Sequence, residues 1–84
     1  MSEFNVMLRQ LRRTYVGKQL SLAGTLGCTE AAISLWEHGE RVPLRPAQAK
    51  IIESFRHAGA QSMELQALQD AYESLARKPR RTPT

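Results

Sequence analysis

The chain has 84 residues, of which 12 are Lys or Arg and 8 are Asp or Glu, so its formal net charge is +4. This length predicts one small domain, and the basic balance favours a polyanionic partner, although many basic proteins bind no nucleic acid. The single cysteine, Cys28, excludes an internal disulfide and is interpreted as a small core residue. No apolar run is long enough to cross a membrane, and no signal-peptide core follows Met1, so we expect a cytoplasmic protein.

The first part of the chain has the spacing of an amphipathic helix. Ser2 can cap a helix that runs from Glu3 to about Tyr15, and Val16-Gly17 should end it. Apolar side chains recur three and four residues apart in this range and should face a core: Phe4, Leu8 and Leu11.

The stretch from Gln19 to Trp36 predicts two short helices joined by a tight turn. The first, at about residues 18–26, should bury an apolar face formed by Leu20, Leu22, Ala23 and Leu26. Gly27 can adopt the left-handed conformation that ends a helix, and Thr29 is a good N-cap for a second helix at about residues 29–38. That second helix should turn three side chains inward: Ala32, Ile33 and Trp36.

Two more helices complete the expected architecture. Pro46 can occupy the first turn of a helix that reaches about His57, and Ser62 can cap a fifth helix at about residues 62–77. We therefore predict an all-α protein, a compact five-helix bundle in a domain that covers residues 1–77. The basic residues 78–84 should form a disordered tail.

Several residues match one known pattern in register. In chain order they are Leu11-Arg12, Gln19, Leu22-Ala23, Leu26-Gly27, Ile33, Trp36, Glu37, Gly39, Arg41 and Pro43. Over about residues 4–55 the chain therefore resembles the phage-repressor/Cro-type (XRE-like) helix-turn-helix DNA-binding proteins. The resemblance implies a repressor-like helix-turn-helix domain with a C-terminal helix. The chain departs from the family at Val16-Gly17, where the family usually has glycine first and the apolar residue second.

The resemblance also implies how DNA would be contacted. In this family the third helix lies in the major groove, with its first half against the base edges. The base-reading residues carried over are Thr29, Glu30, Ala31, Ser34 and Leu35. Glu30 can accept from a cytosine amino group, or it can simply favour the positive end of the helix dipole. The implied phosphate contacts are Lys18, Gln19, Arg41 and Arg45, and the implied structural ion pair joins Arg12 to Glu37.

The fifth helix carries a narrow apolar seam with coiled-coil spacing: Leu65, Leu68, Tyr72 and Leu75. The seam can fold back onto the first and fourth helices, or part of it can form a two-fold interface with a second copy. We expect the seam to form a homodimer interface, because a small DNA-binding domain needs two half-sites for useful sequence specificity.

The expected function is a sequence-specific transcription regulator, a dimeric repressor that binds a palindromic operator in double-stranded DNA. A phage or mobile-element regulator, a restriction-modification controller and an antitoxin-like autoregulator all fit, in a bacterial or phage-encoded protein associated with the nucleoid. The alternative is a protein-interaction module that has kept the fold and lost specific DNA binding. The sequence shows no nucleophile–base pair, metal-ligand spacing or phosphate loop, so we expect no enzyme, cofactor, metal or small-molecule effector.

Overall fold

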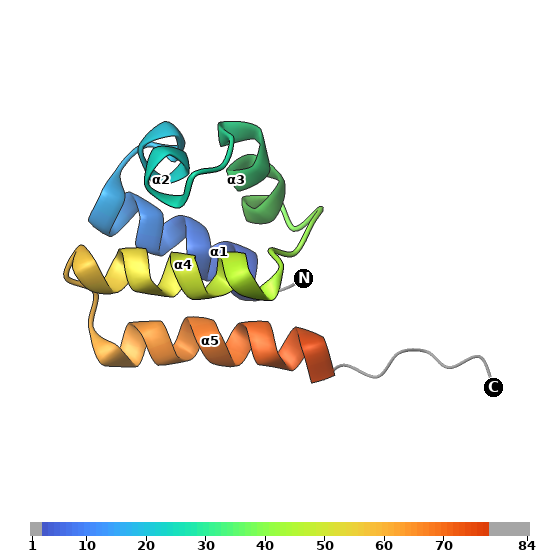
Figure 1. Cartoon of the computed structure of the whole chain (residues 1–84). Helices are drawn as coiled ribbons and strands as arrows, with labels where there is room; N and C mark the ends of the chain where they lie inside the picture. The colour runs from blue at the N-terminus through green and yellow to red at the C-terminus, as the bar shows by residue number, and fades with distance from the viewer. Residues whose placement is uncertain (1–2, 78–84) are drawn as a thin grey trace.

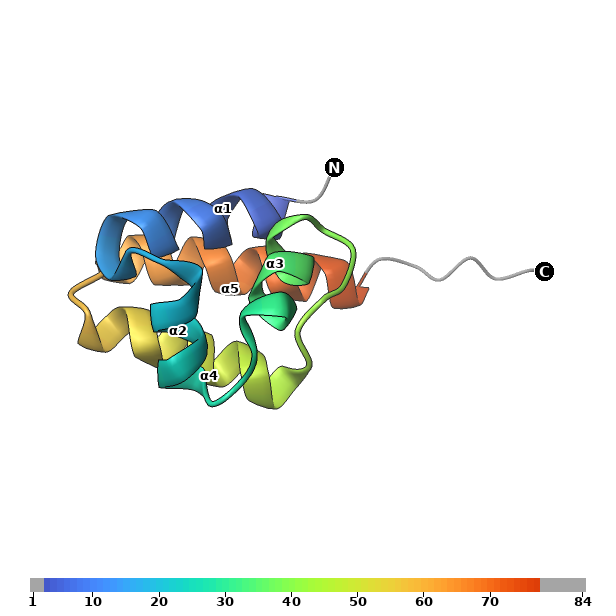
Figure 2. The same cartoon turned by 90° about the horizontal axis from the view of Figure 1, so that it is seen from above.

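Two short helices rest on three longer ones in the computed structural model of the protein, which describes residues 3–77 (Figure 1). In chain order the elements are α1 (Glu3–Leu11), the π-helix η1 (Arg12–Val16), α2 (Gln19–Leu26), α3 (Glu30–Glu37), α4 (Arg45–His57) and α5 (Ser62–Arg77). Figure 2 shows α1 and α4 on either side of α5, with α2 and α3 packed above them. The predicted all-α five-helix bundle is confirmed.

One core joins all five α-helices. Its buried side chains are Phe4, Leu8, Leu11, Leu22, Ala23, Leu26, Ile33, Ile51, Ile52, Phe55, Leu65, Leu68 and Tyr72. Trp36 and Cys28 are only partly buried and pack against the edge of this core. Among the described residues, no helix is long and apolar enough to span a membrane.

The first helix does not continue as an α-helix to Tyr15. The α-helical part ends at Leu11, and the chain then widens into η1. The Gly17 N–H donates to the Arg12 carbonyl, five residues earlier, at 2.7 Å. Gly17 has φ 107° and ψ −106°, a backbone conformation that is open essentially to glycine alone. The apolar spacing could not predict this wider turn, because the one buried residue of η1 is Arg12, so the segment has no pattern of buried apolar side chains.

The turn between α2 and α3 forms as predicted. Gly27 ends α2 with φ 73°, and the Cys28 N–H donates to the Ala23 carbonyl at 3.0 Å. The prediction for Leu20 was wrong, because this side chain is 64% exposed. Leu20 precedes Leu22 by two residues, so on a helix it lies about 200° around the axis, away from the core.

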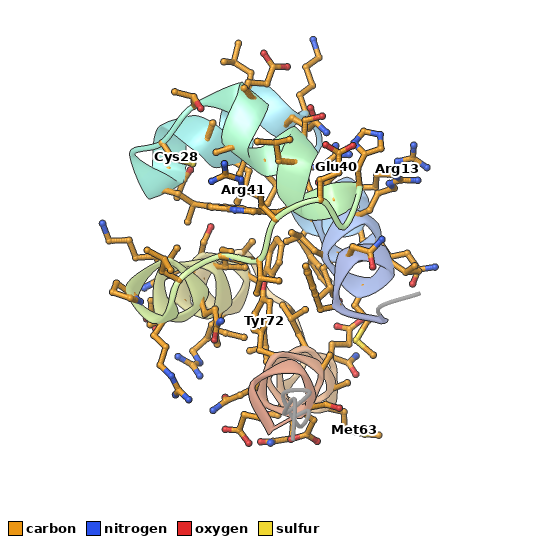
Figure 3. The ribbon with its side chains drawn as sticks, turned by 90° about the vertical axis from the view of Figure 1, so that its right-hand side faces the viewer. Arg13, Cys28, Glu40, Arg41, Met63 and Tyr72 are labelled. Carbon is orange, nitrogen blue, oxygen red and sulfur yellow. The ribbon has the colours of Figure 1, made fainter. Side chains whose placement is uncertain are left out.

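The prediction of a dimer seam on α5 was also wrong for the three seam residues whose side chains are described. Leu65, Leu68 and Tyr72 are buried inside the single chain, between α1 and α4, and the rings of Phe4 and Tyr72 lie 5.5 Å apart. Figure 3 shows Tyr72 pointing from α5 into the interior. These side chains fold back because the apolar faces of α1 and α4 need a cover, which α5 provides. The side chain of Leu75 and the predicted tail at residues 78–84 lie outside the described part of the chain.

Candidate nucleic-acid interface

The first turn of α3 is held by Thr29. The Thr29 hydroxyl accepts a hydrogen bond from the Ala32 N–H at 3.1 Å, as a helix N-cap does. The same side chain is exposed, together with Glu30 and Ala31. Three of the five predicted base-reading residues therefore lie together on an open surface.

The other two predicted readers are half-buried. The Ser34 hydroxyl oxygen lies 3.3 Å from Nδ1 of the His38 imidazole. The same nitrogen lies 2.8 Å from the Ser34 carbonyl oxygen. Leu35 does not stand free, because it lines an apolar groove with Trp36 and Val42. The chain after α3 turns back over Leu35, whose carbonyl accepts from the N–H groups of Glu40 and Arg41.

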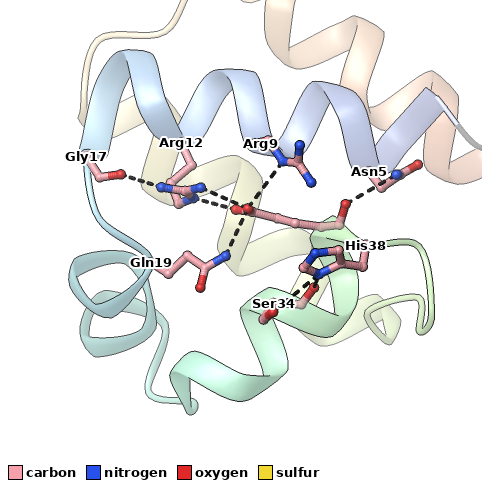
Figure 4. Close-up of polar contacts among 8 residues, drawn as sticks. Asn5, Arg9, Arg12, Gly17, Gln19, Ser34 and His38 are labelled. Carbon is pink, nitrogen blue, oxygen red and sulfur yellow. Dashed lines mark hydrogen bonds and ion pairs between the residues drawn. The ribbon is translucent and has the colours of Figure 1, made fainter.

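The last residue of α3 is held by the first residue of η1. Arg12 Nε donates to Glu37 Oε2 at 2.5 Å, and Arg12 Nη2 donates to Glu37 Oε1 at 2.9 Å. Both side chains are buried, so the ion pair that the resemblance implied is present in the fold. Figure 4 shows that further groups converge on it from α1 and α2.

Three of those groups complete the network around Glu37. Gln19 Nε2 donates to Glu37 Oε1 at 3.1 Å, and Arg9 Nε lies 3.9 Å from the same oxygen. Arg12 Nη1 also donates to the Gly17 carbonyl at 2.5 Å. One carboxylate thus ties α3 to α1, to η1 and to the start of α2.

The network keeps Glu37 ionised. Burial by itself raises the pKa of Glu37, but hydrogen bonds from Arg12 and Gln19 and the nearby positive charge lower it by more, so the net shift is downward. The hydrogen bond to Glu37 in turn raises the pKa of Arg12 against the opposing effect of burial. The pair is therefore charged at neutral pH, and its role is to fix α3.

The predicted phosphate contacts do not all lie where expected. Lys18 and Arg41 are exposed, on either side of α2 and α3 in the chain. Gln19 is half-buried and its side-chain amide is engaged with Glu37, so only its main-chain N–H at the start of α2 suits a phosphate. Arg45 lines a different groove, between α4 and α5, with Gln69 and Tyr72.

Lys50 is a cation near α3 that the sequence pattern did not predict. It is exposed on α4 and lines the same groove as Arg41, beside Leu35 and Trp36 of α3. Lys50 follows Ala47 by three residues, which puts both on one side of α4. That spacing was visible in the sequence, but which side of α4 faces α3 was not.

Comparison with known proteins yields no relative, since no protein-family model, curated protein or solved structure matches this chain. The likeness to phage-repressor/Cro-type proteins therefore rests on the residue pattern. Within residues 3–77, no group of three or more His, Cys, Asp or Glu side chains is placed to hold a metal ion.

Proposed function

We propose that this protein is a sequence-specific DNA-binding transcription regulator of the phage-repressor/Cro type. The observation that carries the proposal is the two-sided character of α3. Its inner side is fixed by the buried Ile33 and by the Glu37 network, while its N-terminal residues Thr29, Glu30 and Ala31 are exposed. A rigidly held helix with an open N-terminal half is the geometry that major-groove reading needs.

The surroundings of α3 suit a polyanion. Lys18 and Arg41 are exposed cations, and the first N–H groups of α2 are not capped by the side chain of Lys18. Helix N-termini and exposed cations are common phosphate contacts and set most of the salt dependence of DNA binding. In this proposal the phosphate contacts orient the protein, and the exposed start of α3 reads the bases.

A homodimeric repressor on a palindromic operator remains our proposal for the assembled state, in a bacterial or phage-encoded cytoplasmic protein. Since three residues of the α5 seam are internal, the two copies would meet through another surface. Sedimentation of the purified protein over a range of concentrations tests this part. A monomer at all concentrations, with and without operator DNA, would contradict it.

Selection of bound sites from a random DNA pool, at near-physiological salt, tests the proposal directly. We expect an enriched inverted repeat whose half-sites are about one helical turn apart, roughly 34 Å. Enrichment should be lost in Ala31→Glu, which adds a charge to the exposed face, and kept in Arg56→Gln, a control on α4. A pool that yields no enriched motif would argue against this function.

One observation favours the alternative, a protein-interaction module. The exposed start of α3 offers Glu30 and Ala31, without the Gln, Asn or Arg side chains that make bidentate base contacts. A flat salt dependence of any residual DNA affinity would favour this alternative, because phosphate contacts release counterions when they form.

A further inference from the structure

An apolar groove of about 530 Å³ runs between α3 and the start of α4. Its walls come from the turn after α2, from α3, from the loop after α3 and from the first turns of α4. The residues that line it are Leu26, Cys28, Ala32, Leu35, Trp36, Arg41, Val42, Leu44, Pro46, Ala47 and Lys50. In Figure 3, Arg41 and Cys28 lie on the same side of the molecule, above α4. This volume is in the range of small-molecule sites, about 300–1,000 Å³.

Only two of the residues that line the groove carry a formal charge, and both are cations. Arg41 and Lys50 form no ion pair with any side chain among residues 4–74, the range over which the structure describes side chains, and no carboxylate lines the groove. Burial raises the pKa of the Cys28 thiol, and the positive charge of Lys50, which lines the same groove, opposes that rise. The groove therefore combines an apolar wall with an unneutralised positive rim.

Leu44 is not explained by the fold. It is 77% exposed, and it occupies the N-cap position of α4, where a side-chain acceptor is the usual residue. Its side chain makes no cap, and Val42 beside it is 47% exposed. Two large apolar side chains thus stand at the rim of an apolar groove and would gain burial from an occupant.

We propose that this groove binds a small amphipathic anion, a carboxylate with an aliphatic chain of medium length. The chain would lie against Leu26, Leu35 and Leu44, and the carboxylate would be held by Arg41 and Lys50. A second copy of the protein is a poorer occupant, because it would bring the same cations against the rim. DNA is a poorer occupant as well, since its phosphates could bind the two cations but it has no aliphatic chain to pack against the apolar side chains of the groove.

Binding in the groove would regulate the proposed function. Arg41 is shared, because it would hold a DNA phosphate in one state and the carboxylate in the other. Occupancy would therefore weaken DNA affinity, and this consequence rests on the proposed DNA-binding function. The binding of the anion itself does not rest on it and is measured without DNA.

Trp36 and Cys28 make the groove directly measurable, because each is the only residue of its type in the chain. The experiment is a titration of the purified protein with decanoate below its micelle concentration, followed by Trp36 fluorescence. We expect a saturable change, with Cys28 protected from iodoacetamide over the same concentrations. Decyltrimethylammonium, which has an aliphatic chain of nearly the same length and a cationic head, should bind far more weakly.

Matched variants locate the site. Lys50→Gln and Arg41→Gln should each weaken decanoate binding by about tenfold, the effect of removing one hydrogen bond to a charged group. Arg56→Gln, which removes an exposed cation of α4 outside the groove, should bind decanoate like the unmodified protein. All three side chains are exposed, and the circular dichroism of each variant shows whether it is folded.

Three results would overturn the proposal. The first is no saturable change in Trp36 fluorescence, and the second is equal binding of decanoate and decyltrimethylammonium. The third is an apparent decanoate affinity that rises as the protein is diluted, which would show a second copy in the groove. If decanoate binds as expected and no DNA site is selected, the proposed function fails and the groove assignment stands.

Discussion

Arg12 and Glu37 lie 25 positions apart in the chain and share two hydrogen bonds, of 2.5 and 2.9 Å, in the interior of the protein. The pair joins the start of η1 to the last residue of α3. Because both side chains are buried, removing one of them leaves the other as an uncompensated charge.

The first prediction concerns this pair. Arg12→Leu and Glu37→Leu should each lower the free energy of unfolding by about 3–5 kcal/mol, because each leaves the partner as a buried, unpaired charge. The double variant Arg12→Leu/Glu37→Leu should lose much less than the sum of the two, since it leaves no unpaired charge. Denaturant unfolding of the four proteins gives these values. Additive losses would mean that the two residues stabilise the fold independently.

The second prediction is the pH dependence that Glu37 produces. The network lowers the pKa of Glu37 below its ordinary value of 4.5, so the folded state binds this proton less readily than the unfolded state does. Its contribution is fully present above pH 4.5 and is lost as the pH falls through the lower, folded pKa. The stability difference between the unmodified protein and Glu37→Gln should therefore shrink in acid, as measured by urea unfolding at several pH values. A difference that is constant with pH would contradict the shift.

The third prediction compares two glycines. Gly17→Ala should destabilise the protein by about 1–3 kcal/mol, because φ 107° is strained for any residue with a Cβ. Gly24 has no such conformation, and a Cβ built there would meet no atom within 4 Å. Gly24→Ala should therefore stabilise α2 by up to about 1 kcal/mol. Thermal unfolding of both variants measures the contrast, and a destabilised Gly24→Ala would reveal a close neighbour at that position.

The fourth prediction compares two tyrosines. The Tyr72 hydroxyl is buried without a hydrogen-bond partner among the described residues, and its burial raises the pKa of Tyr72. Tyr72→Phe should therefore be neutral or stabilising by about 1 kcal/mol. The Tyr15 hydroxyl donates to Glu64 Oε1 at 2.5 Å, so Tyr15→Phe should instead cost about 1 kcal/mol. Equal losses in the two variants would show that Tyr72 has a partner after all.

The fifth prediction separates positioning residues from reading residues on DNA. Arg41→Ala should weaken binding to all sequences alike and flatten the slope of log affinity against log salt by about one unit. Glu30→Ala and Ser34→Ala should instead change the preference among sequences and leave the slope nearly unchanged. Fluorescence anisotropy with a small panel of duplexes measures both effects. Identical behaviour of the two kinds of variant would contradict the assignment.

The sequence predicted the helices well because their signals are local. The Thr29 cap, the Gly27 turn and the apolar spacing of α1 and α5 need no knowledge of distant residues. Apart from Leu20 and the π-helix η1, the wrong predictions concern which other helix each helix face contacts. Nothing near Gln19 indicates that its amide would point at Glu37, and nothing near Arg45 indicates that it would face α5. The groove beside α3 was missed for the same reason, since its walls come from four separate segments of the chain.

The π-helix η1 has a consequence for the length of the chain rather than for its composition. Its turn holds one residue more than an α-helical turn, as the bond from the Gly17 N–H to the Arg12 carbonyl shows. Deleting one residue at the exposed Arg13 or Thr14 would let this segment wind as an α-helix, in which the Gly17 N–H would meet the same Arg12 carbonyl from four residues away instead of five. Gly17 would keep nearly the same place at the end of the helix, where its carbonyl accepts from Arg12 Nη1. A chain shorter by one residue here could therefore keep both the buried ion pair and the direction in which α2 begins.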